Sequence, residues 1–376
     1  MRQLASVPQM IKVYCRICYF LQLLLISSLL LLIENYIYIY NPQLMEVSSS
    51  VNNPPKKIRG IFILIFTPFG GKMNYLDGLK TPKNILTEWE QEDNKKSNII
   101  KKTKFSIIDN ELLGLRPGQF LIVGGRPGTG KTTFLINLIN NIEQTLSENE
   151  YILFISFEQS SNEIVEKLFA LNTCEKLKTF YEIDKKEILN RNPEATQKLK
   201  EQKILIYDNA SLMVEQITTL INEIESNLNI KIKALFLDHI QITQTTINGN
   251  RYEKTSIVSR TLKITALQNN IPVIALSQLS RDYAKKTAAK PTAPNITDLR
   301  DSGNLEQDAD IIMFLYELDN ENDNLLKELG VSIVKNRNGR LTKSKVIFSP
   351  IFAKIWDYEE AAKLGITNSL KGAQNE

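Results

Sequence analysis

The segment Gly125-Arg126-Pro127-Gly128-Thr129-Gly130-Lys131-Thr132 constrains the fold more than any other part of the chain. It follows the apolar run Phe120–Val123, and it precedes a stretch whose apolar residues recur at helical spacing. Glycines let the backbone turn its N–H groups inward around phosphate oxygens, and a helix N-terminus adds partial positive charge. The sequence therefore predicts a strand, a phosphate-binding loop and a helix in succession.

This spacing also predicts what the loop binds. Lys131 is expected to reach the β- and γ-phosphates of ATP, and the Thr132 hydroxyl is expected to bind Mg²⁺. ATP and Mg²⁺ are therefore the predicted cofactors. The residues expected around the ATP phosphates are Gly125, Arg126, Pro127, Gly128, Thr129, Gly130, Lys131, Thr132 and Thr133.

A second Mg²⁺ ligand is expected from another buried strand. Four apolar residues, Ala234–Leu237, end in Asp238, which places a carboxylate at the carboxyl edge of a sheet. Ligands of open α/β sheets bind at that edge. Alone, Asp238 would be read as an ordinary strand-ending residue, but the phosphate loop favours the metal role.

Two further polar residues follow predicted strands at the same edge. Glu158 lies two residues after the run Tyr151–Ser156, and a carboxylate there could orient the attacking water. Gln278 follows Val273–Leu276, and its amide could sense the γ-phosphate. From the pattern alone, Glu158 could equally be a surface residue, and the case for Gln278 is weaker.

Short apolar runs alternate with helical patterns along most of the chain. This alternation indicates β-α units and strands that are covered on both faces. We therefore predict an α/β fold with a mainly parallel central sheet and helices on both faces. The eight expected strands are Phe120–Val123, Tyr151–Ser156, Lys203–Tyr207, Ala234–Leu237, Val273–Leu276, Ile311–Tyr316, Val331–Val334 and Lys345–Phe348.

Composition excludes several classes of protein. Three cysteines in 376 residues are too few for a disulfide scaffold, and the net charge of +4 is too small for a nucleic-acid coat. The sole histidine, His239, argues against a histidine-built metal site or a Ser-His-Asp enzyme. We expect a cytoplasmic protein.

Residues 1–72 form an atypical N-terminal segment. Residues 17–33 are almost entirely apolar and follow basic residues, so they are either a membrane anchor or part of a mis-set start ahead of Met73. Membrane contact is expected only in the first case. The Cys15-Arg16-Ile17-Cys18 pair carries no expected metal or redox role. Residues 73–104 are read as a linker with a short helix.

Taken together, the motifs resemble the C-terminal motor domain of the DnaB-type replicative DNA helicases, which are RecA-like P-loop ring ATPases. The resemblance covers about residues 105–358 and is carried by Gly114-Leu115-Arg116-Pro117-Gly118, by the phosphate loop, by four later blocks and by a last block near residue 337. The four later blocks are Phe157-Glu158-Gln159-Ser160, Leu237-Asp238-His239-Ile240-Gln241, Ala275 to Arg281, and Asp298 to Asp310. It implies that Glu158 is the catalytic glutamate and Gln278 the coupling residue. His239 stands where the family usually has an aromatic, which favours a packing role.

The block from Asp298 to Asp310 implies binding of single-stranded DNA. By position in the family motif, Arg300, Asp301 and Gly303 are the expected DNA contacts, with Asp301 replacing the family's usual Glu. The polar segment between Arg281 and Asp298 contains several lysines and suits a mobile, positively charged channel loop. Without the resemblance, a solvated linker would be the better reading.

A last block, Val334-Lys335-Asn336-Arg337-Asn338-Gly339, is similar to the family's trans-acting segment. The resemblance implies that Arg337 is an arginine finger for the neighbouring subunit, with Lys335 beside it, in a six-membered homo-oligomeric ring. A basic strand end is the structural alternative. Residues 1–104 do not resemble the family's N-terminal helical domain, so primase binding does not follow.

The sequence thus predicts an ATP-dependent DNA helicase that translocates on single-stranded DNA and unwinds duplex in replication. A RecA-like DNA-dependent ATPase of recombination or repair, without unwinding, is one alternative. A non-catalytic ATP-regulated ring subunit is another, although it would need neither Glu158 nor Arg337. We expect the motor domain at residues 105–358 and a flexible tail at 359–376.

Overall fold

The computed structural model describes residues 80–91, 99–173, 175–286, 292–299, 302–318 and 325–367. The chain divides into two compact units, Met1–Asp93 and Asn94–Glu376. In the first unit the described residues form helix α4 (Pro82–Gln91), at the place where a short helix was expected. The apolar run at 17–33 and the Cys15–Cys18 pair lie outside the described residues. No helix in the described ranges has both the length and the apolar character needed to span a membrane.

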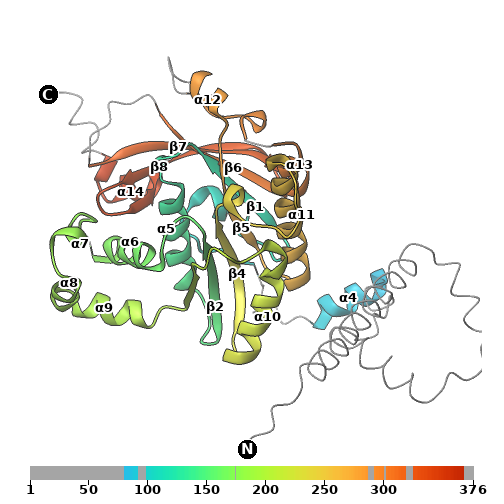
Figure 1. Cartoon of the computed structure of the whole chain (residues 1–376), viewed down its shortest axis with the longest axis horizontal. Coiled ribbons are helices and arrows are strands. Elements are labelled where there is room, and N and C mark those ends of the chain that lie inside the picture. Colours follow the sequence, from blue (N-terminus) through green and yellow to red (C-terminus); the bar gives the residue numbers. More distant parts are fainter. Residues whose placement is uncertain are drawn as a thin grey trace, which may run out of the picture. The chain divides into compact units, whose positions relative to one another are not determined.

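The second unit is built on one nine-stranded sheet with the order β3-β2-β4-β5-β1-β6-β7-β8-β9 (Figure 1). Strands β1 to β6 are parallel, and β6 to β9 pair antiparallel. The predicted α/β class with a mainly parallel sheet is confirmed. The strands are β1 (Phe120–Gly125), β2 (Glu150–Ser156), β3 (Ile204–Tyr207), β4 (Lys231–Asp238), β5 (Val273–Gln278), β6 (Ile311–Glu317), β7 (Lys327–Asn336), β8 (Thr342–Ser349) and β9 (Lys354–Asp357).

Helices cover both faces of the sheet because apolar residues alternate between two cores along each central strand. In β1, Leu121 and Val123 belong to one core, whereas Phe120 and Ile122 belong to the other. The first core includes α5 and α6, and the second includes α10 and α11 (Figure 1). The larger helices are α5 (Lys131–Glu143), α6 (Ser161–Thr173), α8 (Lys185–Arg191), α9 (Pro193–Lys200), α10 (Ile217–Leu228), α11 (Arg251–Asn269) and α13 (Ser302–Asp308).

All eight predicted strands are present, and β9 was not predicted. Its four residues include only Ile355 and Trp356 as apolar positions, too few to stand out from a loop. Helix α14 (Tyr358–Lys363) follows β9 directly and is capped by the Asp357 carboxylate. Ala361 is fully buried, so residues 359–363 belong to a packed helix and the prediction of a flexible tail is wrong for them.

The segment predicted as a channel loop between Arg281 and Asp298 also begins with a helix, α12 (Arg281–Lys286). The Tyr283 ring is buried, and its hydroxyl donates to the Thr292 carbonyl at 2.7 Å. Lys286 Nζ lies 3.0 Å from Asp298 Oδ1. The aromatic residue and this ion pair hold both ends of the segment, and residues 287–291 lie outside the described ranges.

Candidate active site

The phosphate loop connects β1 to α5, as the motif predicted. Strand β1 ends at Gly125 and α5 begins at Lys131. Gly128 and Gly130 have φ angles of 82° and 84°, which only glycine adopts without strain. A Cβ on Gly130 would also lie 3.0 Å from the Phe348 ring of β8. Glycine at this position therefore allows both the turn and the close approach of β8.

The loop opens onto a cavity of about 260 Å³ at the carboxyl edge of the parallel strands. Three of the predicted phosphate-binding residues do not line it. Gly125 ends the strand, and the Thr129 hydroxyl donates to the Arg126 carbonyl at 2.8 Å, which stabilises the turn from inside. The predicted residues that do line it are Pro127, Gly128, Gly130, Lys131, Thr132 and Thr133.

Thr132 and Asp238 meet although 106 positions separate them. The Thr132 hydroxyl donates to Asp238 Oδ2 at 2.7 Å, and Asp238 is 1% exposed. Hydroxyl and carboxylate oxygens are ligands that Mg²⁺ prefers. This donor set fits the predicted metal site, because the two oxygens already lie side by side at the mouth of the phosphate loop.

Burial perturbs the ionisation of both charged residues at the loop. It lowers the pKa of Lys131 to about 8, against the opposing attraction of the Asp238 and Glu158 carboxylates. It raises the pKa of Asp238 to about 6, although the hydrogen bond from Thr132 acts in the opposite direction. Desolvated charges of this kind interact strongly with phosphate and metal because little water screens them.

Glu158 lies across the same cavity, on the segment that follows β2. Its Oε2 is 3.0 Å from His239 Nδ1, and its side chain is 51% exposed, so solvent can reach the carboxylate. His239 Nδ1 is also 3.7 Å from Asp238 Oδ1, and the three side chains place their donor atoms within 4.8 Å of one another. Burial lowers the pKa of His239, which favours the neutral ring. We expected His239 to have a packing role, but its ring also contacts the carboxylates of Glu158 and Asp238.

Gln278 ends β5 and lines the cavity. It pairs in register with Gly125 of β1, so it lies beside the start of the phosphate loop. The Gln278 backbone N–H donates to Gln241 Oε1 at 3.2 Å, and Gln241 Nε2 donates to Ser277 Oγ at 2.7 Å. A single side chain from the segment after β4 therefore holds the end of β5 in place.

Sequence reasoning missed Lys167, a cation in the cavity wall. It lies on α6, and its Nζ donates to Gln159 Oε1 at 2.6 Å. Burial lowers the pKa of Lys167, opposed mainly by the Asp238 carboxylate. The only sequence signal was a lysine on the helix after Glu158. Gln159 and Lys167 are eight residues apart in the sequence, and this separation did not predict that Lys167 lies in the cavity wall.

Of the predicted DNA contacts, only Gly303 lies in the described part of the chain, near the start of α13. Arg300 and Asp301 lie outside it. A Cβ on Gly303 would lie 3.0 Å from Tyr252 Oη, so the α13 backbone passes close to the first turn of α11. Asn304 Nδ2 donates to the same hydroxyl at 3.2 Å.

Arg337 and Lys335 do not join the cavity of their own subunit. Arg337 Nη1 lies 3.2 Å from Asp310 Oδ1, and Asp310 Oδ2 accepts from the Phe120 backbone N–H at 2.8 Å. Phe120 begins β1, whereas the phosphate loop follows the far end of that strand. At about 3.3 Å per residue, the six-residue strand separates the two positions by about 16 Å.

Lys335 lies beside Arg337 at this amino edge. Its Nζ donates to the Ala309 carbonyl at 2.6 Å, and burial lowers its pKa. Both basic residues therefore contact the C-terminal end of α13 and the turn into β6, not the phosphate loop.

A known protein-family model matches most of the second unit. The family model described as the DnaB-like helicase C terminal domain matches residues 101–357, which include every site residue named above. The chain belongs to the DnaB-like helicase family. The predicted resemblance is confirmed.

Two relatives in this family are named as replicative helicases. The chain is 34% identical over 266 residues to a "Probable plasmid replicative DNA helicase" of Chlamydia psittaci, covering 69% of this chain and 56% of the relative. It is 30% identical over 259 residues to a "Replicative DNA helicase DnaB" of Mycoplasma genitalium, covering 65% and 53%. The DnaB-like chain thus spans about half the length of these relatives.

Solved structures support the fold of the DnaB-like unit. One structure, titled as an "ATPase Domain", matches 77% of this chain and 99% of its own, with a TM-score of 0.63 and 24% identity. A structure titled "The Structure Of A DnaB-Like Replicative Helicase And Its Interactions With Primase" matches 92% of this chain and 79% of its own, with a TM-score of 0.62 and 24% identity.

Proposed function

We propose that this DnaB-like chain is an ATP-hydrolysing DNA helicase that translocates on single-stranded DNA and unwinds duplex during replication. The observation that carries the proposal is the convergence of Lys131, Thr132, Asp238 and Glu158 on one cavity of about 260 Å³. These residues come from three different strand ends, and each has the chemistry that one part of phosphoryl transfer needs. A protein that only binds nucleotide would not need the solvent-accessible carboxylate of Glu158.

In this proposal the chain's own groups divide the work of hydrolysis. Backbone N–H groups of the loop bind phosphate oxygens, and the Lys131 ammonium binds the β- and γ-phosphates. Thr132 and Asp238 would hold Mg²⁺, which when bound offsets negative charge on the phosphates. Glu158 orients the attacking water and accepts its proton, because its carboxylate faces the cavity and is half exposed.

Gln278 couples this site to DNA. Its side chain lines the ATP cavity, and its backbone belongs to the strand next to β1. A shift of Gln278 on hydrolysis would therefore reach the segment that follows β5 and continues toward residues 300–303. Arg300, Asp301 and Gly303 are the proposed contacts to single-stranded DNA.

The position of Arg337 supports a site shared between subunits. It pairs with Asp310 beside the start of β1, and the length of β1, about 16 Å, separates that edge of the sheet from its own phosphate loop, so it cannot complete that site. In a head-to-tail ring, the same edge of one subunit faces the next subunit's cavity. We propose a homo-oligomeric ring, with six subunits, in which Arg337 and Lys335 act on the neighbour's ATP.

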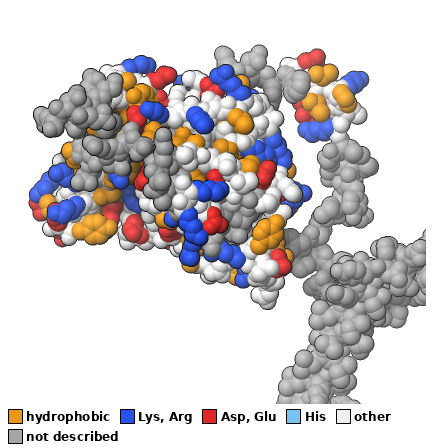
Figure 2. Space-filling model, turned by 90° about the horizontal axis from the view of Figure 1, so that it is seen from above, with side chains coloured by type: hydrophobic (Ala, Val, Ile, Leu, Met, Phe, Trp, Pro, Cys, Tyr) orange, Lys and Arg blue, Asp and Glu red, His pale blue; other side chains and the backbone are white. Residues whose placement is uncertain are grey.

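The distribution of surface charge supports DNA contacts that are confined to particular loops. Figure 2 shows Lys and Arg side chains gathered in several groups on one face, with acidic side chains between them. The net charge is +4. The mixed pattern of that face favours contacts at specific loops over broad electrostatic adsorption.

The proposal is tested by measuring phosphate release from ATP with and without a single-stranded oligodeoxynucleotide. We expect Mg²⁺-dependent hydrolysis that DNA stimulates. Hydrolysis that no single-stranded DNA affects would contradict the DNA motor. DNA-stimulated hydrolysis without strand displacement would instead indicate the recombination-type ATPase.

A further inference from the structure

Glu158, Asp238 and His239 form a cluster of metal-binding groups at the wall of the ATP cavity. Each side chain offers one donor atom, and these atoms lie within 4.8 Å of one another. His239 is the only histidine in the chain, so the cluster combines one imidazole nitrogen with two carboxylate oxygens. The division of work proposed above for hydrolysis gives His239 no role.

The distances in this cluster suit a single divalent ion. His239 Nδ1 lies 3.0 Å from Glu158 Oε2 and 3.7 Å from Asp238 Oδ1. Two ligand atoms about 2.1 Å from one ion lie about 3.0–3.7 Å apart when the angle between them at the ion is about 90–125°. The Glu158 side chain is 51% exposed, so it has room to adjust toward the other two ligands.

His239 Nδ1 is a buried nitrogen without a hydrogen bond. The residue is only 5% exposed, and Nδ1 has no hydrogen-bond partner among the described residues, although Glu158 Oε2 lies close to it. A buried polar atom without a partner costs free energy, and binding to an ion would replace the missing hydrogen bond. This nitrogen therefore points to a ligand independently of the two acidic side chains.

Asp238 can bind an ion at this cluster and still contact Thr132. Its Oδ2 accepts the hydrogen bond from the Thr132 hydroxyl, whereas Oδ1 is the oxygen near His239. A carboxylate can bridge two cations in this way, and the ions of two-metal sites lie about 3.5–4 Å apart. An ion at the cluster would therefore lie beside the proposed Mg²⁺ site without replacing it.

Two lysines border the same cavity, and each is bound to an acceptor outside the cluster. Lys131 Nζ donates to the Arg126 carbonyl at 2.8 Å, and Lys167 Nζ donates to Gln159 Oε1 at 2.6 Å. When ATP is bound, its phosphates would also attract Lys131. The approach of a cation to the three ligands therefore does not require breaking a direct ion pair with either lysine.

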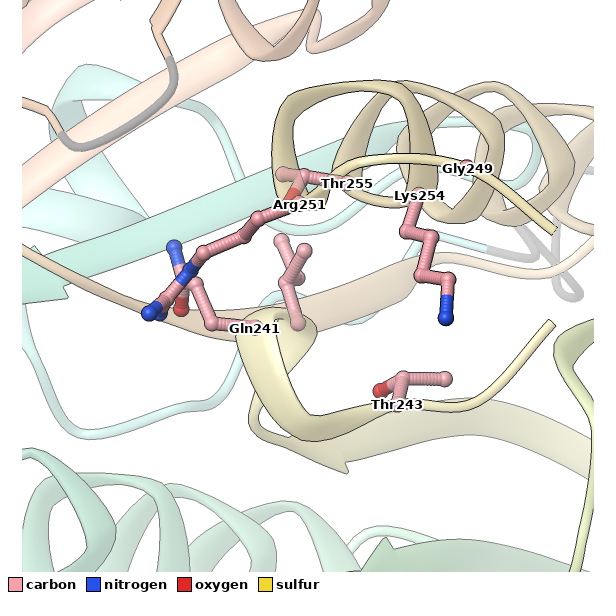
Figure 3. A pocket seen from close by; sticks show the side chains of 7 residues that line it. Gln241, Thr243, Gly249, Arg251, Lys254 and Thr255 are labelled. Atoms are coloured by element: carbon pink, nitrogen blue, oxygen red, sulfur yellow. The ribbon is translucent and has the colours of Figure 1, made fainter.

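A neighbouring cavity has a different character. It has a volume of about 270 Å³ and borders the short helix η4 (Ile240–Ile242), whose N-cap residue is His239 (Figure 3). Among the described residues, its lining includes Gln241, Arg251 and Lys254 but no carboxylate or imidazole. A divalent cation that reaches this part of the molecule would therefore bind on the ATP side.

We propose that Glu158, Asp238 and His239 bind a divalent transition-metal ion such as Co²⁺ or Zn²⁺, and that this ion inhibits ATP hydrolysis by occupying Glu158. A site with an imidazole nitrogen favours such ions over Mg²⁺, which prefers oxygen ligands. When Oε2 of Glu158 binds the ion, it no longer accepts the proton of the attacking water. The inhibition rests on the proposed ATPase function, whereas binding of the ion does not.

The first test follows Co²⁺ binding to the full, untagged chain without nucleotide. Because the chain has one histidine, proton resonances of a Co²⁺-bound imidazole, which are strongly shifted by the paramagnetic ion, can arise only from His239. Thiolates also bind such ions, so all three cysteines are replaced by serine. We expect one set of shifted imidazole resonances, and we expect His239→Phe to remove it.

The affinity for Co²⁺, measured from the visible absorption of the bound ion, distinguishes these ligands from other carboxylates. Loss of an outer partner of a metal site already weakens binding about 10–100-fold, so Glu158→Gln and His239→Phe, which each remove a ligand, should weaken it at least about tenfold. Glu182→Gln makes the same change at a glutamate that is 53% exposed, and it should leave the affinity unchanged. Bound Co²⁺ without shifted imidazole resonances, or unchanged affinity in both ligand variants, would refute the site.

The second test measures ATP hydrolysis at saturating Mg²⁺ with added Zn²⁺, and each rate is expressed relative to the same protein without Zn²⁺. We expect Zn²⁺ to inhibit, and His239→Phe to raise the half-inhibitory concentration at least about tenfold. Equal sensitivity of the two proteins would overturn the inhibitory role, because Zn²⁺ would then act elsewhere. If the chain hydrolyses no ATP, the inhibition falls with the proposed function, while Co²⁺ binding still decides whether the metal site exists.

Discussion

Two inactive variants of this chain should restore each other when mixed. Arg337→Ala removes the proposed finger, and Lys131→Ala removes the ammonium that faces the phosphates. Arg337 lies at the amino edge of the sheet, and the length of β1, about 16 Å, separates that edge from its own phosphate loop, so each variant is expected to damage a different subunit's site. Arginine fingers contribute about 10³–10⁵ in rate, so each variant alone should show almost no hydrolysis.

The size of the recovery follows from ring geometry. At each interface the site needs an intact Lys131 from one subunit and an intact Arg337 from the next. In an equimolar mixture with random order, about one quarter of the interfaces carry both intact residues. If the sites hydrolyse independently, the mixture should reach about one quarter of the unaltered rate.

The assay is steady-state phosphate release under conditions that assemble rings, with single-stranded DNA present. Subunit exchange is followed separately by energy transfer between labelled subunits. A mixture that exchanges subunits but stays as inactive as its parts would refute the trans role. Arg337 would then be a residue that stabilises its own subunit through Asp310.

Three further predictions concern single residues. Glu158→Gln should still bind ATP but hydrolyse it about 10²–10⁴-fold more slowly, because an amide cannot accept the proton of the attacking water. If the variant loses nucleotide affinity by the same factor as it loses hydrolysis rate, Glu158 is not the base. Burial lowers the pKa of Lys131 to about 8, and Lys131 binds phosphate only when it is protonated. Nucleotide affinity should therefore fall about tenfold per pH unit above pH 8. Binding of a fluorescent ATP analogue measures this affinity, and an affinity that stays constant up to about pH 9.5 would contradict the prediction. Asp310→Ala should lower the free energy of unfolding by about 3–5 kcal/mol in urea titration, because it leaves the Lys263 ammonium, 2.7 Å away and mostly buried, without its partner. The exposed pair of Asp282 and Lys285 provides the control, since Asp282→Ala should cost at most about 1 kcal/mol.

The sequence predicted those parts of the structure that depend on local pattern. Runs of apolar residues identified eight strands because strands buried on both faces leave little room for polar residues. The phosphate loop and Asp238 could be predicted because their chemistry requires a strand end at the carboxyl edge. Strands β1 and β4 end at the same edge of the sheet with only β5 between them, so Thr132 and Asp238 can form a hydrogen bond.

Other features could not be predicted because they depend on contacts between distant segments. Lys167 enters the cavity only because α6 packs against α5, the helix that follows the phosphate loop. Asp310 binds Phe120, Lys263 and Arg337 from three separate parts of the chain, and nothing in its own neighbourhood indicates this. The environment of His239 likewise depends on where the loop carrying Glu158 lies.

Strand displacement on a forked DNA substrate is the most direct test of the proposed helicase function. The full chain is incubated with ATP, Mg²⁺ and a fork whose labelled strand is released on unwinding, with Lys131→Ala as the control. We expect ATP-dependent release by the unaltered chain and none by the variant. DNA-stimulated hydrolysis with no strand release, under conditions where rings are shown to assemble, would contradict the helicase function.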